Sequence, residues 1–365
     1  MNFYEIYKEL NKIDFDKYIN ATTSTDIVRA ISKEKLDYRD FIALLSPAAK
    51  VHLEDMAQKA HKITLQHFGR TVLLYTPVYL SNYCSNYCAY CSFSAKNKIR
   101  RRQLSFKQVE EEAKEVFKTG LRHVLLLTGE SRDRTPLDYI AECVRIFKKY
   151  FSSVAVEIYP LDVDEYKTLI SAGVDSLTIY QEIYNEEIYD KLHISGPKKD
   201  YRYRMDAPER ACRAKMFSVN IGALLGLWEW RSEVFFVGMH ASYLQDKYLD
   251  TVISVSVPRI RPNLSGFKPC CEVSDSDLVQ IILALRIFMP RVGITLSTRE
   301  HADLRDNLIR LGVTKMSAGV NTEVGGRTLD EKTAAQFEIS DKRSVAEITR
   351  MLKISGYQPV FKDWC

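Results

Sequence analysis

The sequence lacks the apolar segments that mark exported and membrane-spanning proteins. Its first fifteen residues, MNFYEIYKELNKIDF, have neither the basic start nor the continuous apolar stretch of a secretory signal. The longest apolar run, Ile281 to Met289, is interrupted by Arg286 and is far shorter than the about 20 residues that span a bilayer. We therefore expect a cytoplasmic protein that does not enter the membrane.

The sequence also lacks a strong charge of one sign and any internal division. Its 52 Lys and Arg against 47 Asp and Glu give a net charge of +5 over 365 residues, which does not indicate general binding to nucleic acid. No repeat, low-complexity tract or Pro/Ser-rich linker divides the chain. With 46% apolar and 27% charged residues, the composition is that of a globular protein with a large core.

The cysteines lack the pattern of a closed zinc site. Three of the eight form C-x3-C-x2-C in LSNYCSNYCAYCSFS, and no second C-x2-C knuckle follows to complete four ligands. Disulfides are not expected in a reducing compartment. An iron–sulfur cluster held by three cysteines leaves one iron open for a substrate or cofactor. The spacing therefore favours a cluster bound by Cys84, Cys88 and Cys91.

Eight short β-rich runs alternate with helical patterns from about residue 70 onward, which predicts a parallel sheet. Eight strands of this kind fit a closed α/β barrel, so we predict a (β/α)8 TIM-type fold over residues 71–365, preceded by a helical N-terminal extension over residues 1–70. The predicted strands are Thr76–Leu80, His123–Thr128, Val154–Tyr159, Ser176–Tyr180, Ser218–Leu225, Val252–Val257, Val292–Leu296 and Lys315–Ala318.

Barrel active sites form at the carboxyl ends of the strands, and these ends are polar here. Glu157 stands out because it lies in the apolar setting VAVEIYP, where a carboxylate needs a partner. Arg259 and Arg261 fit a site and a structural role at the barrel rim equally well.

The cysteine motif, with Tyr90 directly before the last Cys, resembles the signature of radical S-adenosylmethionine (SAM) enzymes. The segments PVYLSNYC, LLLTGE, VEIYPL, VDSLTIYQEIY, RPNLSGF, LSTRE and QPVFKDW are similar to those of the aromatic amino acid lyases of that superfamily, most of all the tyrosine lyases of thiamine biosynthesis. The likeness covers nearly the whole chain.

This resemblance implies a [4Fe-4S] cluster and S-adenosylmethionine as cofactors. A 5′-deoxyadenosyl radical would remove a hydrogen from the amino group of L-tyrosine, and the Cα–Cβ bond would break to give p-cresol and 2-iminoacetate. The implied partners are a thiazole synthase that accepts the product and a flavodoxin or ferredoxin that donates electrons.

The resemblance also implies roles for particular residues. The cluster would be ligated by Cys84, Cys88 and Cys91. Arg299, helped by Ser317, would bind the carboxylate of the amino acid, and Tyr79 would face its amino group. The expected SAM contacts are Tyr90 and Leu224 at the adenine, Gly129 and Glu130 at the methionyl amino group, Glu157 at the ribose and Arg204 at the carboxylate. Two alternatives remain open: Arg204 is an exposed charge on a helix, and Leu224 is an ordinary residue of the apolar core. Gln181 and Glu182 fit a contact with either the substrate or SAM.

Three other classes of protein fit part of this pattern. A related lyase that cuts tryptophan would share the same motifs. A hydrogenase-maturation lyase would add a second cluster, for which Cys270, Cys271 and Cys365 offer no C-x2-C pair. A non-catalytic iron–sulfur scaffold or redox sensor would leave Glu130, Arg204 and Arg299 without a role.

A basic run, KNKIRRRQ, follows the cysteines. It is either a solvated loop or a contact for an acidic electron donor.

Overall fold

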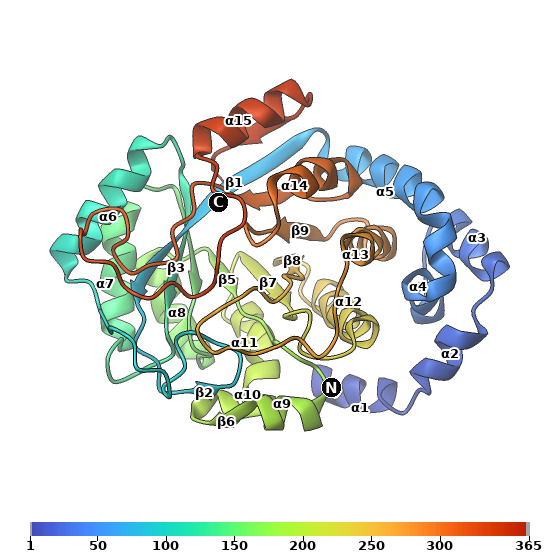
Figure 1. The fold of residues 1–365 in the computed structure, drawn as a ribbon, viewed down its shortest axis with the longest axis horizontal. Coiled ribbons are helices and arrows are strands. Elements are labelled where there is room, and N and C mark those ends of the chain that lie inside the picture. Colours follow the sequence, from blue (N-terminus) through green and yellow to red (C-terminus); the bar gives the residue numbers. More distant parts are fainter. Residues whose placement is uncertain (1, 363–365) are drawn as a thin grey trace.

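The computed structural model describes residues 2–362 as a parallel barrel with helices around it (Figure 1). Eight strands pair in the order β10, β9, β8, β7, β5, β4, β3, β1, and β10 pairs with β1 to close the barrel. The strands are β1 (Thr71–Ser81), β3 (His123–Thr128), β4 (Ser153–Glu157), β5 (Ser176–Thr178), β7 (Ser218–Gly222), β8 (Val252–Ser256), β9 (Gly293–Leu296) and β10 (Lys315–Ser317). All eight predicted strands and the predicted barrel are confirmed.

Three short strands lie outside this barrel and were not predicted. β11 (Gln358–Val360) runs parallel to the start of β1, with Thr71 opposite Gln358. β2 (Tyr87–Cys88) and β6 (His193–Ser195) form a separate antiparallel pair. Strands of two or three residues carry too little alternation to be recognised in a sequence.

Helices connect the strands and cover the outside of the barrel. The connecting helices are α6 (Phe106–Lys118), α7 (Leu137–Lys148), α8 (Val163–Ala172), α9 (Glu186–Leu192), α10 (Tyr201–Met205), α11 (Ala207–Arg213), α12 (Trp230–Lys247), α13 (Asp275–Phe288), α14 (Ala302–Leu308) and α15 (Val345–Ile354). Their ends follow local chemistry. Ser105 caps α6 in a reciprocal pair with Gln108, and α8 ends at Gly173 in the left-handed conformation, with φ of 112°.

Five helices precede β1: α1 (Phe3–Leu10), α2 (Phe15–Ala21), α3 (Ser24–Ser32), α4 (Tyr38–Leu45) and α5 (Leu53–Phe68). They lie along the outer side of α12 and α13 (Figure 1). The Gln280 amide on α13 donates hydrogen bonds to the carbonyls of Leu44 and Ser46, at 2.9 and 2.8 Å, and Phe41 stacks on Phe288 with ring centroids 4.2 Å apart. The N-terminal helices therefore share a core with the barrel's helices.

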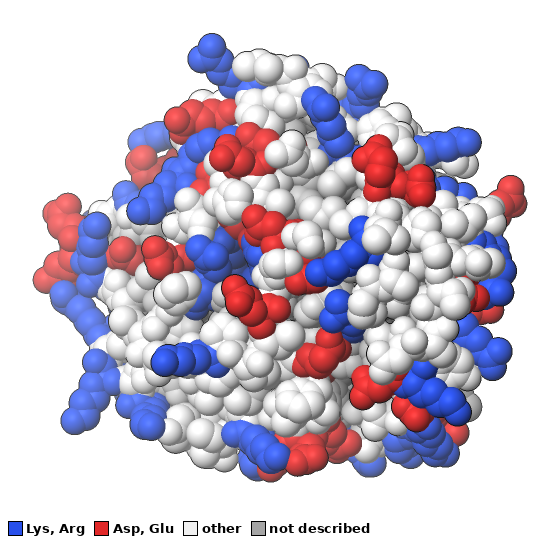
Figure 2. All heavy atoms as spheres, turned by 45° about the vertical axis from the view of Figure 1, so that its right-hand side comes forward, with Lys and Arg blue, Asp and Glu red and all other residues white. Residues whose placement is uncertain are grey.

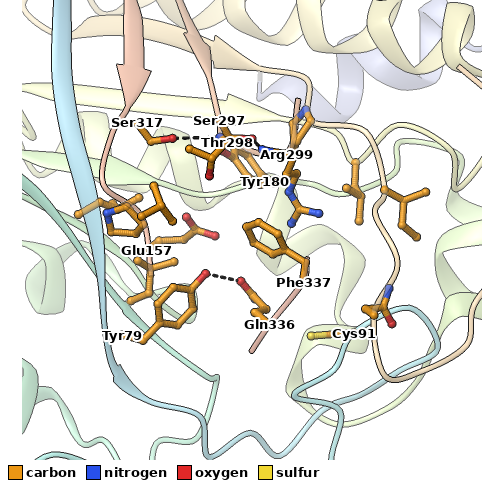
Figure 3. A pocket seen from close by; sticks show the side chains of 18 of the residues that line it. Tyr79, Cys91, Glu157, Tyr180, Ser297, Thr298, Arg299, Ser317, Gln336 and Phe337 are labelled. Atoms are coloured by element: carbon orange, nitrogen blue, oxygen red, sulfur yellow. Dashed lines mark hydrogen bonds between the residues drawn. The ribbon is translucent and has the colours of Figure 1, made fainter. Parts of the chain in front are cut away.

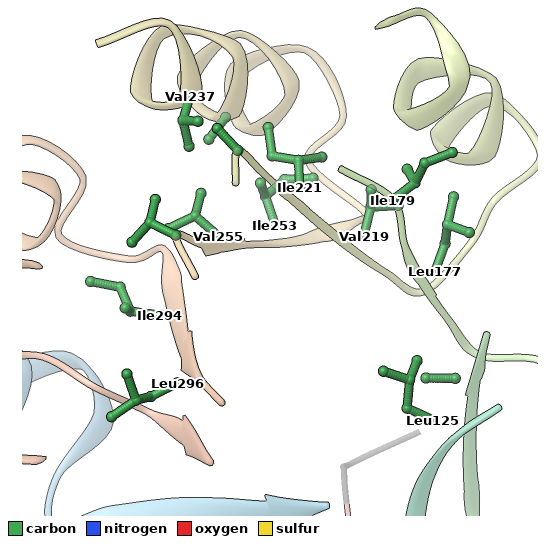
Figure 4. Packing of buried hydrophobic residues seen from close by; sticks show 14 of the residues in the cluster. Leu125, Leu177, Ile179, Val219, Ile221, Val237, Ile253, Val255, Ile294 and Leu296 are labelled. Carbon is green, nitrogen blue, oxygen red and sulfur yellow. The ribbon is translucent and has the colours of Figure 1, made fainter. Parts of the chain in front are cut away.

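The main apolar core lies between the strands and the helices. Ile221 of β7, Ile253 of β8 and Val237 of α12 are buried together there (Figure 4). Since side chains alternate along a strand, the other face of each strand points into the barrel. Those inward positions are often polar, as with Ser254 and Ser256, which both hydrogen-bond to the Asn220 side chain.

Positive and negative side chains alternate over the surface seen in Figure 2, and neither sign forms a large continuous area on that face. None of the helices among residues 2–362 is both long enough and apolar enough to span a membrane.

Candidate active site

Two adjoining pockets open at the carboxyl ends of the strands. One, here called the cysteine pocket, is lined by Cys84, Cys88, Cys91, Glu130 and Arg204. The other, the arginine pocket, is lined by Arg299, Ser317, Phe337 and several aromatic and apolar side chains. Both pockets share Tyr79, Cys91, Leu127, Glu157, Tyr180, Glu182, Lys198 and Gln336. The two pockets are thus parts of one site.

The cysteines lie on the loop that follows β1. Cys88 is in β2, opposite His193 of β6, and this pairing holds the loop to the segment after α9. The backbone N–H of Ser85 donates to the carbonyl of Glu130 at 3.0 Å, which holds the loop against the end of β3. A Cβ at Gly129 would lie 2.2 Å from the carbonyl oxygen of Tyr83, so only glycine allows this close approach.

The three thiols fit the ligand set of an iron–sulfur cluster held by three cysteines. They face one pocket and form no disulfide. Among the described residues, no three His, Cys, Asp or Glu side chains are placed to hold a single metal ion. Burial raises the pKa of each thiol, that of Cys91 to about 11, so the thiolates need a metal partner.

Four charged side chains form a buried cluster beside the cysteines. The Arg204 guanidinium lies 2.8 Å from Glu130, and Lys198 lies 2.8 Å from Glu182. Burial opposes the ionisation of Glu130, but Arg204 and Lys198 outweigh it and hold the pKa of this carboxyl below its usual range. Arg204 is only 5% exposed, so the alternative of a surface charge is wrong. Glu130 and Arg204, which we expect at the amino group and the carboxylate of one methionyl moiety, are next to each other, as are those two groups on its α-carbon.

Glu157 lines both pockets, and Figure 3 shows it in the arginine pocket. None of the described residues donates a hydrogen bond to its carboxylate. Burial, together with the negative charge of Glu182, raises the pKa of Glu157 to about 7, and the positive charges of Arg299 and Lys198 only partly oppose this rise. This carboxyl is thus available to a ligand's hydroxyl groups, as a contact with a ribose requires.

Arg299 reaches into the arginine pocket from the loop after β9 (Figure 3). Its guanidinium lies 3.5 Å from the centre of the Phe337 ring and forms no ion pair or hydrogen bond with any residue in 2–362. Burial lowers its pKa. An oriented guanidinium without an acceptor is ready for a ligand carboxylate.

Ser317 and Tyr79 complete the arginine pocket. The hydroxyl of Ser317 accepts a hydrogen bond from the Thr298 N–H at 3.1 Å and can still donate one to a ligand. The Tyr79 hydroxyl donates to the side-chain oxygen of Gln336 at 2.7 Å (Figure 3). Gln336 and Phe337 belong to a long segment after β10, which places them over the pocket.

The remaining predicted residues have mixed positions. Tyr90 and Leu224 both line the arginine pocket. Leu224 is therefore not only a core residue, although its side chain is buried. Gln181 lines neither pocket, whereas Glu182 lines both. Arg259 and Arg261 have structural roles, since Arg259 pairs with Glu300 and Arg261 donates to Ser340. Of the candidate cysteines, Cys365 falls outside the described residues.

Sequence reasoning missed Lys198, His193, Gln336 and Phe337. Lys198 follows a proline in a basic turn and looks like an ordinary surface lysine. His193 accepts the Tyr90 hydroxyl at 2.8 Å, because its other ring nitrogen must donate to the carbonyl of Tyr189. Gln336 and Phe337 lie in a segment without helix or strand, and no local pattern predicts where it folds.

Comparisons with known proteins agree with this geometry. Residues 78–231 match the model of the radical SAM superfamily, and residues 256–358 match the Biotin and Thiamin Synthesis associated domain. The chain is similar to the 2-iminoacetate synthases of Salmonella typhimurium and Escherichia coli, each 38% identical over 363 residues, with 99% of this chain and 96% of each relative covered. It is also similar to the crystal structure of HydG, a maturase of the [FeFe]-hydrogenase, with a TM-score of 0.91 and 31% identity over 98% of this chain and 80% of that one.

The closed barrel, the three thiols beside β1 and the superfamily match define a radical SAM enzyme. Proteins of this superfamily work with a [4Fe-4S] cluster and S-adenosylmethionine. With 38% identity over nearly the full length of both chains, the protein belongs to the family of the 2-iminoacetate synthases.

Proposed function

We propose that the protein cleaves the Cα–Cβ bond of L-tyrosine to give 2-iminoacetate and p-cresol, for thiazole formation in thiamine biosynthesis. Membership of the 2-iminoacetate synthase family supports this reaction. The observation that carries it in the structure is Arg299, a guanidinium without an acceptor in a pocket that adjoins the three cysteines.

The cysteine pocket would hold the cofactors. Cys84, Cys88 and Cys91 would ligate the [4Fe-4S] cluster, and the open iron and Glu130 would receive the methionyl end of S-adenosylmethionine. Arg204 would approach its carboxylate, Glu157 its ribose and Gly129 its methionyl amino group. Tyr90 and Leu224 would contact its adenine from the adjoining arginine pocket. When bound, these groups supply a 5′-deoxyadenosyl radical.

The arginine pocket would hold the amino acid. Arg299 would bind the tyrosine carboxylate through two parallel hydrogen bonds, and Ser317 would add a third. Tyr79 would then face the amino group at the boundary with the cysteine pocket. Gln336 and Phe337 would cover the substrate and exclude water, which protects a reactive intermediate from side reactions. The chain's contribution is therefore to position the amino group, since proximity and orientation give large effective concentrations.

Two partners follow from this proposal. A one-electron donor such as flavodoxin or ferredoxin would reduce the cluster, and a thiazole synthase would accept 2-iminoacetate before water hydrolyses it.

The decisive experiment is anaerobic reconstitution of the full chain with iron and sulfide, followed by SAM, dithionite and one amino acid at a time. We expect 5′-deoxyadenosine and p-cresol with L-tyrosine. Skatole or indole from L-tryptophan, without p-cresol from tyrosine, would assign the related tryptophan chemistry instead. No 5′-deoxyadenosine with any amino acid would favour a non-catalytic iron–sulfur protein.

A further inference from the structure

The segment after the cysteine loop returns alongside the end of β1. Ser81 and Gln103 form an antiparallel bridge, and the backbone N–H of Leu104 donates to the carbonyl of Leu80 at 2.9 Å. Asn82, which is completely buried, exchanges hydrogen bonds with Arg102 through its backbone and its side chain. Residues 100–104 therefore form an extended strand-like segment, in which successive side chains point to opposite sides.

This alternation separates three consecutive arginines. Arg100 and Arg102 point to the same side, where both pair with Glu331, and Arg102 also donates to the Glu331 carbonyl at 2.7 Å. The Arg100 side chain is 55% exposed. The two guanidinium groups thus share one carboxylate, whose single negative charge offsets one of their two positive charges.

Arg101 points to the other side, toward the cysteine loop. Its guanidinium donates to four backbone carbonyls: Asn82 at 2.6 Å, Phe93 at 2.8 Å, Ser94 at 2.7 Å and Asn97 at 3.3 Å. Asn82 lies two residues before Cys84, and Phe93 lies two residues after Cys91. Arg101 forms no ion pair with any residue in the described part of the chain. One side chain thus joins both ends of the loop and keeps an uncompensated positive charge there.

We propose that Arg101 is a positioning residue for the iron–sulfur cluster. Its guanidinium holds the two ends of the cysteine loop together, an arrangement here called the lock, and places a positive charge beside the cluster. The proposal rests on the proposed function insofar as it needs a cluster on these cysteines. The lock itself is a property of the chain. A guanidinium suits this role because its donors form a planar fork that reaches several acceptors at once, whereas an ammonium is a compact point charge.

The lock is tested by amide hydrogen exchange on the full chain before cluster assembly. We expect the amides of residues 82–97 to exchange at least tenfold faster in Arg101→Lys and Arg101→Gln than in the parent. Arg100→Gln is the matched control, since it removes a charge from the adjacent residue without touching these carbonyls, and it should exchange like the parent. Exchange in both Arg101 variants equal to that of Arg100→Gln would refute the lock.

The charge is tested on the reconstituted protein by the midpoint potential of the cluster, followed by electron paramagnetic resonance. A nearby positive charge stabilises the reduced cluster, so we expect a lower potential in Arg101→Gln. Arg101→Lys retains the charge and should stay close to the parent, as should Arg100→Gln. A parent-like potential in Arg101→Gln would refute the electrostatic part of the proposal. Failure of the parent itself to assemble a cluster would refute the proposed function, whereas the exchange comparison would still decide the lock.

Discussion

Replacing Arg299 by Lys tests the substrate pocket most directly. The structure gives two reasons to expect a large loss of affinity for tyrosine. The guanidinium has no acceptor within the described chain, so its full hydrogen-bonding capacity is available to a carboxylate, and it lies 3.5 Å from the centre of the Phe337 ring, which fixes its plane. A lysine ammonium keeps the charge but loses the forked pair of hydrogen bonds and the stacking.

The magnitude is bounded by the cost of truncating one partner of a buried, hydrogen-bonded charge pair, about 2–5 kcal/mol, and Arg299→Lys should lie toward the lower end of this range because lysine keeps the charge. At about 1.4 kcal/mol for each factor of ten, this corresponds to a dissociation constant for tyrosine that is roughly 30-fold to a few thousand-fold higher. The affinity for SAM should fall by a smaller factor than that for tyrosine, because Gly129, Glu130 and Arg204 line only the cysteine pocket, whereas Arg299 lines only the arginine pocket.

Anaerobic equilibrium dialysis with labelled tyrosine and labelled SAM measures both constants on the same reconstituted preparation. Ser317→Ala is a useful companion variant, since it removes one weaker hydrogen bond and should lower tyrosine affinity by a smaller factor. Equal tyrosine affinity in Arg299→Lys and the parent would remove Arg299 from the substrate site. An equal loss of SAM and tyrosine binding would assign it to both ligands or to the structure of the pocket.

Three further predictions follow from other parts of the site. Alanine at Cys84, Cys88 or Cys91 should abolish iron binding and SAM cleavage. Cys143→Ala, in the buried face of α7, should retain both. SAM cleavage retained in any of the first three variants would refute their assignment as cluster ligands. Since Glu157 has a raised pKa of about 7, the folded state binds its proton more tightly than the unfolded state. The contribution of Glu157 to the free energy of unfolding should therefore fall by at most about 3 kcal/mol as pH rises from 4 through 7, and level off above about pH 8. Urea unfolding should show this loss diminished in Glu157→Gln, and an unchanged pH dependence would contradict it. Glu at both Lys96 and Lys98, which are exposed, should slow turnover with flavodoxin at low salt but not with dithionite, and equal rates with flavodoxin would show that the loop does not contact the donor.

The barrel was predictable because its signals are local. Each inner strand is a short β-rich run, each is followed by a helix with three-and-four spacing, and together they leave few alternative folds. The cysteines were predictable for a similar reason, since a cluster motif is a spacing within eight residues. The positions of polar residues after strands, such as Glu130 and Glu157, followed from the rule that barrel sites form at those ends.

The contacts across the site were not predictable from the same signals. Gln336 and Phe337 lie more than 250 residues after Tyr79 in the sequence, in a segment without periodicity, and only the folded chain brings them to it. Lys198 likewise gains its role from burial next to Glu182, which is a property of the fold and not of the residues around it. Composition and spacing identify what a residue can do, but its burial and partners decide whether it does so.

The run of three arginines illustrates this limit within a single short segment. In the sequence, Arg100, Arg101 and Arg102 are equivalent members of a basic run, and a solvated loop or a donor contact would treat them alike. The antiparallel bridge between Ser81 and Gln103 fixes the register of the segment, and a shift of one residue would exchange the two faces. In that shifted register, Arg101 would meet Glu331, and its neighbours would face the cysteine loop. The proposed role of Arg101 therefore depends on a long-range pairing that no inspection of the basic run alone reveals.

For the same reason, reversing the charge of all three arginines together would disrupt the cysteine loop as well as any contact with an electron donor. The exposed pair Lys96 and Lys98 separates these two effects.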